Sequence, residues 1–242
     1  MTSGPIDFIR NSPPFLSLSR RRGFTLLEIL VAMFILTIVM GLVFGSFNGV
    51  FSNADRLNES GDLFEMADAA MSRIISDLSA IHVMQAPRYK PPDIDDDPEM
   101  FRVVGSNETM GGNNFARLRF TSLAHLAPAV NGSEGIAEIV YYVQPSESDG
   151  YRLFRADNSY PYPEFEPKES DPVLCEKLFS FKLTYYDKEG REFEDWDSED
   201  DDYDYSTPRA VRIELKLGNE ENEYEFRTAI QLPAYRSISP ER

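Results

Sequence analysis

The chain has 242 residues, 41 of them acidic and 24 basic, and its formal net charge is −17. A surface that negative repels phosphate, so it argues against nucleic acid as a partner and favours cations or basic protein surfaces. A single cysteine excludes an intrachain disulfide, and two histidines leave little material for a histidine-based metal site or catalytic triad.

Residues 1–19 are rich in proline and serine and show no periodicity, which is typical of a disordered segment. Arg20, Arg21 and Arg22 follow, and from Ile29 to Phe47 no side chain is charged. Nineteen helical residues span about 28 Å, close to the hydrocarbon thickness of a bilayer. Because basic flanks stay on the cytoplasmic side, we expect one crossing with the C-terminal domain outside.

One carboxylate, Glu28, stands at the inner end of the apolar run, where it needs a partner or the interface. The stretch from Arg21 to Glu28, Arg-Arg-Gly-Phe-Thr-Leu-Leu-Glu, resembles the prepilin processing motif of type IV pilins and type II secretion pseudopilins. The resemblance implies that a prepilin peptidase cuts between Gly23 and Phe24 and that Phe24 becomes the N-methylated first residue. It also implies that Glu28 pairs with a neighbouring subunit's N-terminal amine during assembly. The alternative is a plain anchor whose Glu28 reaches the headgroups.

This resemblance makes residues 1–23 a cleaved leader. Its removal takes away four arginines and one aspartate and leaves 20 basic and 40 acidic side chains, a net charge of −20. We expect residues 24–51 to form the transmembrane half of a long helix. Residues 52–86 form its amphipathic half, which is expected to end near Gln85 because prolines follow from Pro87.

Apolar positions in the amphipathic half recur every three or four residues and predict one stripe that packs on a domain. The stripe comprises Leu57, Leu63, Phe64, Ala67, Ala70, Met71, Ile74, Ile75, Leu78 and Ile81. The polar sides carry Asp62, Glu65, Asp68, Arg73 and Asp77. Glycines within residues 46–53 and at position 61 predict a bend or weak point, which is either a hinge or an ordinary juxtamembrane kink.

Residues 87–236 are expected to form a β-rich domain, and residues 237–242 a tail. The domain begins with an acidic, solvated loop over residues 87–100. Short alternating runs then predict strands, bounded by glycine and asparagine turns. The predicted strands are residues 101–104, 115–122, 136–143, 151–156, 178–186, 209–217 and 224–230. The fold class is therefore α+β: a long helix whose second half packs on antiparallel sheet, as the resemblance to type IV pilins also implies.

The C-terminal part is most similar to the minor pseudopilin J family of type II secretion. The similarity lies in Phe120–His125, Glu138–Val143 with Tyr151–Arg155, Pro208–Leu215 and the closing Tyr224–Pro233. It implies a structural subunit of the pseudopilus tip, held in the inner membrane with its domain in the periplasm. Its partners would be the I-type and K-type minor subunits and the major subunit. The alternatives are a minor type IV pilin, with adhesion or DNA uptake, and a membrane-tethered enzyme.

Two acidic clusters, Asp93–Glu99 and Asp195–Asp204, are read as solvated loops, with calcium binding or a basic neighbour as alternatives. Trp196 lies inside the second cluster. It is expected either to take part in an interface or to cover a sheet edge. Cys175 is expected to be buried, and His125 to be a hydrogen-bonded structural residue. No phosphate loop, metal-ligand spacing or nucleophile elbow occurs, so no cofactor and no catalysis are expected.

Overall fold

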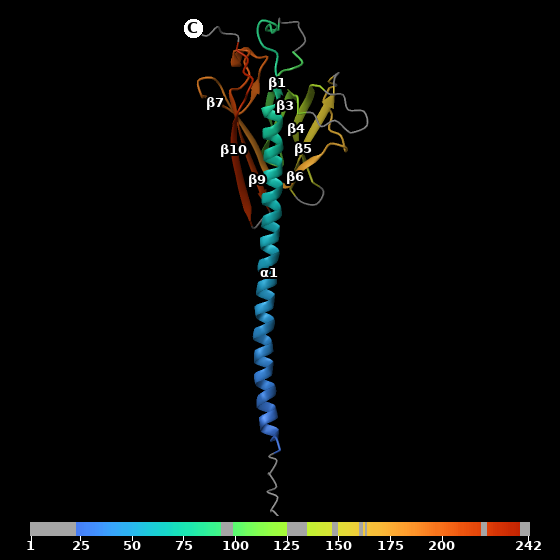
Figure 1. Cartoon of the computed structure of the whole chain (residues 1–242), viewed down its shortest axis with the longest axis vertical. Helices are drawn as coiled ribbons and strands as arrows, with labels where there is room; N and C mark the ends of the chain where they lie inside the picture. The colour runs from blue at the N-terminus through green and yellow to red at the C-terminus, as the bar shows by residue number, and fades with distance from the viewer. Residues whose placement is uncertain are drawn as a thin grey trace, which may run out of the picture. The chain divides into compact units, whose positions relative to one another are not determined.

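The computed structural model describes residues 23–92, 99–124, 135–146, 150–159, 162, 164–218 and 222–237, with backbone alone for 48–59. The chain divides into two compact units between Arg56 and Leu57, and each is described by itself. The helix α1 (Leu26–Ser79) belongs to both, and the strands all lie in the second unit (Figure 1). The α+β class with a long N-terminal helix is confirmed. The expected bend near residues 46–53 stays a prediction, although the backbone there is helical.

The described strands form one sheet. They are β1 (Ile81–His82), β2 (Val104–Met110), β3 (Asn113–Ser122), β4 (Ala137–Pro145), β5 (Tyr151–Ser159), β6 (Val173–Tyr186), β7 (Glu192–Phe193), β8 (Trp196–Asp197), β9 (Ala210–Gly218) and β10 (Glu223–Gln231). The order is β10-β9-β6-β5-β4-β3-β2-β8, with β1 on β3 and β7 on β6. Neighbours along it are antiparallel, and the sheet curls so far that β3 also meets β6 in parallel at Phe115 and Phe181.

The second half of α1 packs on the sheet between β9 and β10 on one side and β4 and β5 on the other (Figure 1). Most of the predicted stripe is buried: Leu63, Ala67, Ala70, Met71, Ile74 and Leu78. Strand β9 alternates as predicted, with Val211, Ile213, Leu215 and Leu217 buried. The predicted burial was wrong for two side chains. Phe64 is 51% exposed, and Asp77, expected on a polar side, is fully buried.

The helix ends at Ser79, six residues before the expected end at Gln85. Strand pairing replaces the last turns, because Ile81 and His82 pair with Ser122 and Thr121 of β3. The Ser122 hydroxyl donates to the Asp77 carbonyl at 2.8 Å and so satisfies one of the carbonyls that a helix end leaves open. The sequence contains no helix breaker before Pro87, so the pairing of β1 with β3 ends the helix rather than the local sequence.

Strand β2 begins at Val104, the last residue of the expected range 101–104, and runs to Met110. The residues of β2 are mostly polar and half exposed, so the sequence shows no alternation of apolar side chains there. The strand pairs with β3 across the Gly111-Gly112 turn, in which both glycines have positive φ. Strand β6 starts at Val173 rather than Leu178. Strand β4 is buried on both faces, since Phe165 covers Tyr142 on the side away from α1.

The acidic segment around Trp196 is folded against the sheet. Trp196 is 1% exposed, its indole N–H donates to the Ser206 carbonyl at 3.0 Å, and its ring contacts Phe193 and Tyr203. Strand β8 pairs with β2 at the end of the sheet. Trp196 is therefore a core residue at the end of the sheet and is not the partly exposed aromatic on which the interface alternative depended.

Candidate processing and assembly site

The predicted processing residues lie directly before α1. Phe24 is 83% exposed, and a Cβ on Gly23 would meet no atom within 4 Å. This fold therefore places no steric demand on residue 23, so a requirement for glycine there would come from an enzyme that reads the segment. Residues 1–22, which include the predicted leader arginines, lie outside the described residues.

Thr25 and Glu28 cap the helix reciprocally. The Glu28 carboxylate accepts from the Thr25 backbone N–H at 2.9 Å and from its hydroxyl at 3.0 Å. The Glu28 N–H in turn donates to the Thr25 hydroxyl at 3.2 Å. This is a capping box, in which two free N–H groups of the first turn are satisfied. The Thr-x-x-Glu spacing is the sequence signature of this box, in addition to the charge of Glu28 on which the assembly prediction rests.

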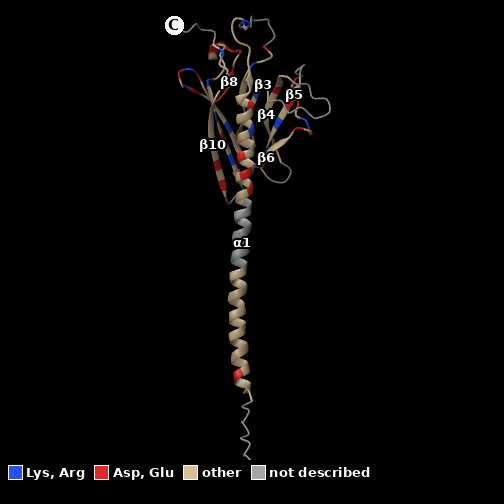
Figure 2. Cartoon of the chain, in the orientation of Figure 1, with Lys and Arg blue, Asp and Glu red and all other residues tan. Residues whose placement is uncertain are grey.

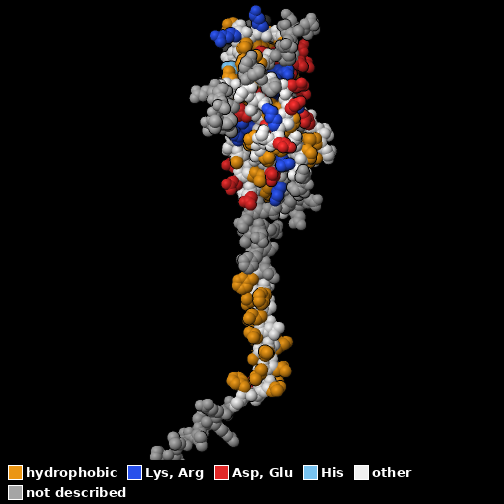
Figure 3. All heavy atoms as spheres, turned by 90° about the vertical axis from the view of Figure 1, so that its right-hand side faces the viewer, with side chains coloured by type: hydrophobic (Ala, Val, Ile, Leu, Met, Phe, Trp, Pro, Cys, Tyr) orange, Lys and Arg blue, Asp and Glu red, His pale blue; other side chains and the backbone are white. Residues whose placement is uncertain are grey.

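The helix from Leu26 to Phe47 is long and apolar enough to cross a membrane, and none of its side chains is buried in the chain. Figure 3 shows this apolar surface, which carries neither acidic nor basic side chains in that view. The Thr37 hydroxyl donates to the Met33 carbonyl at 2.8 Å, so this polar group is satisfied within the helix. Such a surface needs lipid or other apolar helices as its cover.

Inside the domain, a buried ionic cluster joins α1 to the sheet. The Asp77 carboxylate accepts from the Tyr141 hydroxyl at 2.5 Å and from Arg155 Nε at 2.6 Å, and it also contacts Arg73. Arg155 is 1% exposed and also donates to Asp157 at 2.8 Å. Burial and the nearby Asp77 carboxylate raise the pKa of the Tyr141 hydroxyl. This cluster positions the helix, and its carboxylate and hydroxyl are buried and paired with each other and with arginines.

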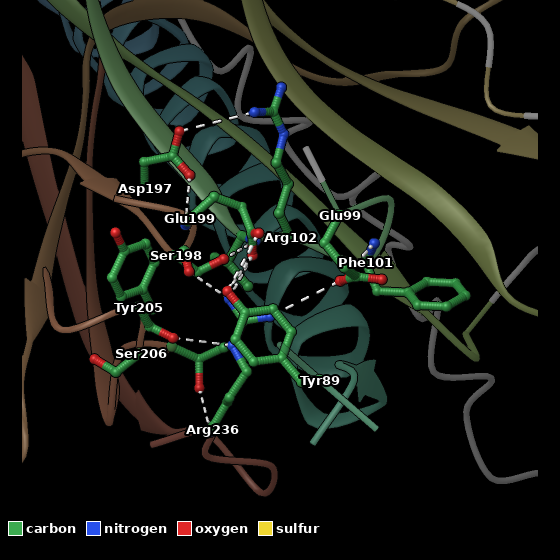
Figure 4. A network of polar contacts seen from close by, with 12 residues as sticks. Tyr89, Glu99, Phe101, Arg102, Asp197, Ser198, Glu199, Tyr205, Ser206 and Arg236 are labelled. Atoms are coloured by element: carbon green, nitrogen blue, oxygen red, sulfur yellow. Dashed lines mark hydrogen bonds and ion pairs between the residues drawn. The ribbon is translucent and has the colours of Figure 1, made fainter. Parts of the chain in front are cut away.

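A second network ties the C-terminal segment to the loops beside it (Figure 4). Arg236 is 1% exposed, donates to Glu199 at 2.6 Å and to the Ser198 carbonyl, and lies 3.6 Å from the centre of the Tyr89 ring. The Tyr89 hydroxyl donates to Glu199 at 3.2 Å. Burial raises the pKa of the nearby Glu99 carboxyl. No pattern in the sequence signals this network, because its members come from three distant segments.

The remaining candidates are the cysteine, the two histidines and the two acidic clusters. Burial raises the pKa of the Cys175 thiol to about 12, which keeps it protonated, and its predicted burial is confirmed. His82 packs edge-on against Phe101, while His125 and residues 93–98 lie outside the described residues. Asp200, Asp201 and Asp202 converge within 4.8 Å but are exposed, and Asp200 caps the short helix η1 (Asp201–Tyr203). Calcium binding stays an untested alternative to the solvated loops that were predicted.

Two family models match the chain. Residues 18–44 match the prokaryotic N-terminal methylation motif, and residues 45–226 match type II secretion system (T2SS), protein J. The second match covers more than half of the chain and includes nearly all of the described domain. Comparison with curated proteins gives no match.

Proposed function

We propose that this chain, which belongs to the type II secretion system protein J family, is a minor pseudopilin of the pseudopilus tip. The family is one of structural pseudopilins and not of enzymes, and membership implies pseudopilin partners. The methylation motif implies processing by a prepilin peptidase, and the apolar helix is consistent with a single-pass anchor in the inner membrane.

One observation carries the proposal: an apolar helix from Leu26 to Phe47 that no described residue covers, with one carboxylate, Glu28, in its first turn. In Figure 2 this part of α1 is tan except for an acidic position near its start. In the membrane, lipid covers this surface before assembly. In a filament, the corresponding helices of neighbouring subunits would cover it, and head-to-tail contacts would propagate. The I-type and K-type minor subunits and the major subunit are the neighbours we propose, with the domain in the periplasm.

Processing supplies the charge that Glu28 needs. Cleavage between Gly23 and Phe24 converts an uncharged peptide N–H into an ammonium group at Phe24. A cation at the start of a helix is unfavourable beside the positive end of the helix dipole. A neighbour's Glu28 carboxylate would neutralise it, and an unpaired charge in an apolar core is costly, so the pair would set the register between subunits.

Replacement of Gly23 tests the processing step. We expect Gly23→Ala to accumulate at precursor mass with an intact domain, because the added Cβ meets nothing in the fold. Gly41→Ala, whose Cβ is equally unobstructed, is the matched control and should be processed normally. Intact-protein mass spectrometry distinguishes the two masses. Mature-sized Gly23→Ala protein would contradict the proposed cleavage site.

Two substitutions of Glu28 separate its charge from its role in the capping box. Glutamine can still cap a helix but carries no charge, whereas alanine does neither. We expect both Glu28→Ala and Glu28→Gln to insert in the membrane and to lose co-purification with the I-type and K-type subunits. If Glu28→Gln retained wild-type complexes, capping alone would explain the residue and the proposed pairing with the amine would be wrong.

A further inference from the structure

An exposed phenylalanine, Phe64, packs on two partly buried aromatic side chains, Tyr224 and Phe226, where α1 meets the edge strand β10. Phe64 is 51% exposed, and its ring centre lies 5.4 Å from that of Tyr224 and 5.1 Å from that of Phe226. Both contacts are edge-to-face, and the Tyr224 hydroxyl is hydrogen-bonded to Ser60 at 2.9 Å. We call these three aromatic residues the Phe64 patch. Its rings are fixed in place, so little side-chain freedom is lost when a partner binds.

Carboxylates flank the patch on α1, where Asp62, Glu65 and Asp68 are exposed. Glu223 and Glu225 of β10 are also exposed, but they alternate with Tyr224 and Phe226 and therefore point to the opposite face of the strand. Figure 2 shows acidic positions on both elements in this region. On that opposite face of β10, Glu223 and Glu225 lie with Lys182, Lys216 and Arg227, and Arg227 contacts Glu225 at 2.7 Å and also Glu214. On α1, residues 56–68 carry one arginine, Arg56, and four acidic residues, Glu59, Asp62, Glu65 and Asp68, so the helix segment beside the patch is net negative.

The position of the patch leaves it open on the strand side. Strand β10 is terminal in the strand order, so no described strand continues the sheet beyond it. Exposed aromatic clusters with a charged rim are typical of protein interfaces, where rigid aromatic side chains act as binding hot spots. An apolar side chain against Phe64, with cations facing the rim, would complement both features.

We propose that the Phe64 patch docks a sibling pseudopilin through an apolar side chain flanked by lysine or arginine. This inference rests on the proposed function and adds the partner surface to it. A second copy of this chain fits poorly, because the same patch would bring like carboxylates together. Beyond Phe47, α1 carries two arginines, Arg56 and Arg73, and Arg73 is already held by Asp77.

The test measures binding of the full-length protein in detergent to the purified I-type and K-type pseudopilins of the same secretion system. We expect Phe64→Ala to raise the Kd for one of them at least about tenfold, as for other aromatic hot spots. Leu123→Ala is the matched control, since Leu123 is 60% exposed and lies next to the C-terminal end of α1, away from the patch. It should change the Kd by less than about twofold. Fluorescence of the single, buried Trp196 confirms that each variant is folded.

Charge reversal tests the nature of the partner. We expect Glu65→Lys and Asp68→Lys to weaken binding. Glu164→Lys is the control, because Glu164 is exposed in the connection between β5 and β6, and it should leave binding unchanged. Added salt should weaken wild-type binding. Wild-type affinity in Phe64→Ala, or tighter binding by Glu65→Lys, would overturn this inference but not the proposed function. Self-association through Phe64 would overturn the choice of partner, because the patch would then bind a second copy of this chain. Failure of the wild type to bind any sibling would count against the proposed function itself.

Discussion

Asp77 lies on the last turn of α1, fully buried, and brings together side chains from α1, β4 and β5. Buried charges are costly unless they are paired and hydrogen-bonded, and here Arg155, Arg73 and Tyr141 supply the partners. The apolar stripe alone would allow α1 to slide or rotate on the sheet. The fixed geometry of this cluster therefore sets the position of the helix.

Removal of the Asp77 charge should destabilise the domain strongly. In Asp77→Asn, the guanidinium of Arg155 stays buried without its main counter-ion, and breaking such a pair costs about 3–5 kcal/mol. Asp68→Asn removes an exposed carboxylate from the same helix and should stay within about 0.5 kcal/mol of wild type. Urea unfolding of the detergent-solubilised protein, followed by Trp196 fluorescence, measures both. Equal stabilities of the two variants would show that the cluster does not hold the helix.

Residues with a local signal were predictable, and residues whose role depends on distant partners were not. Cys175 could be placed in the core because a lone cysteine in a strand-rich region behaves as a small apolar residue. Asp77 could not, because helical periodicity places a carboxylate on the polar side unless Arg155 and Tyr141 are known to face it. Phe64 was misplaced for the opposite reason: the periodicity includes it, but the curled sheet ends at β10 before covering it.

At the scale of elements, the end of α1 depends on strand β3. The helix stops at Ser79 because Ser122, which is fully buried, binds the carbonyls of Asp77 and Ala80 and accepts from the Ala124 N–H at 3.1 Å. The Leu123 N–H also donates to the Ala80 carbonyl at 2.9 Å. These contacts hold the chain in the turn between α1 and β1.

Loss of the Ser122 hydroxyl should loosen this helix end. Ser122→Ala leaves the Asp77 carbonyl and the Ala124 N–H without that partner, and we expect a loss of about 1–3 kcal/mol. Ser106→Ala, an exposed serine in β2, is the control and should be nearly neutral. Urea unfolding gives the stabilities, and faster hydrogen exchange at Ala80 and Leu123 would locate the change. Unaltered exchange at both amides would contradict this account of the helix end.

Elements with strong periodicity were predicted well and elements at the edges were not. Strand β9 shows strict alternation because one face is buried and the other is wet. Strands β2, β7 and β8 are short or polar, and they exist because longer neighbours offer them hydrogen bonds. Their sequences contain no signal of their own. The fold class was therefore predictable, whereas the edges of the sheet were not.

At the scale of the whole molecule, two surfaces with different needs occur in one chain. The apolar helix from Leu26 to Phe47 needs a cover, and the domain is an acidic body with its own core. The N-terminal motif could be recognised from the sequence because it is a linear segment. The Phe64 patch could not, because α1 and β10 build it jointly.

The central claim is that this chain is cut after Gly23 so that its apolar helix can enter a filament. Mass spectrometry of the N-terminal peptide of the protein isolated from cells tests it most directly. We predict a peptide that begins at Phe24 and carries an N-methyl group. A peptide that begins at Met1, or at any residue other than a methylated Phe24, would contradict the account.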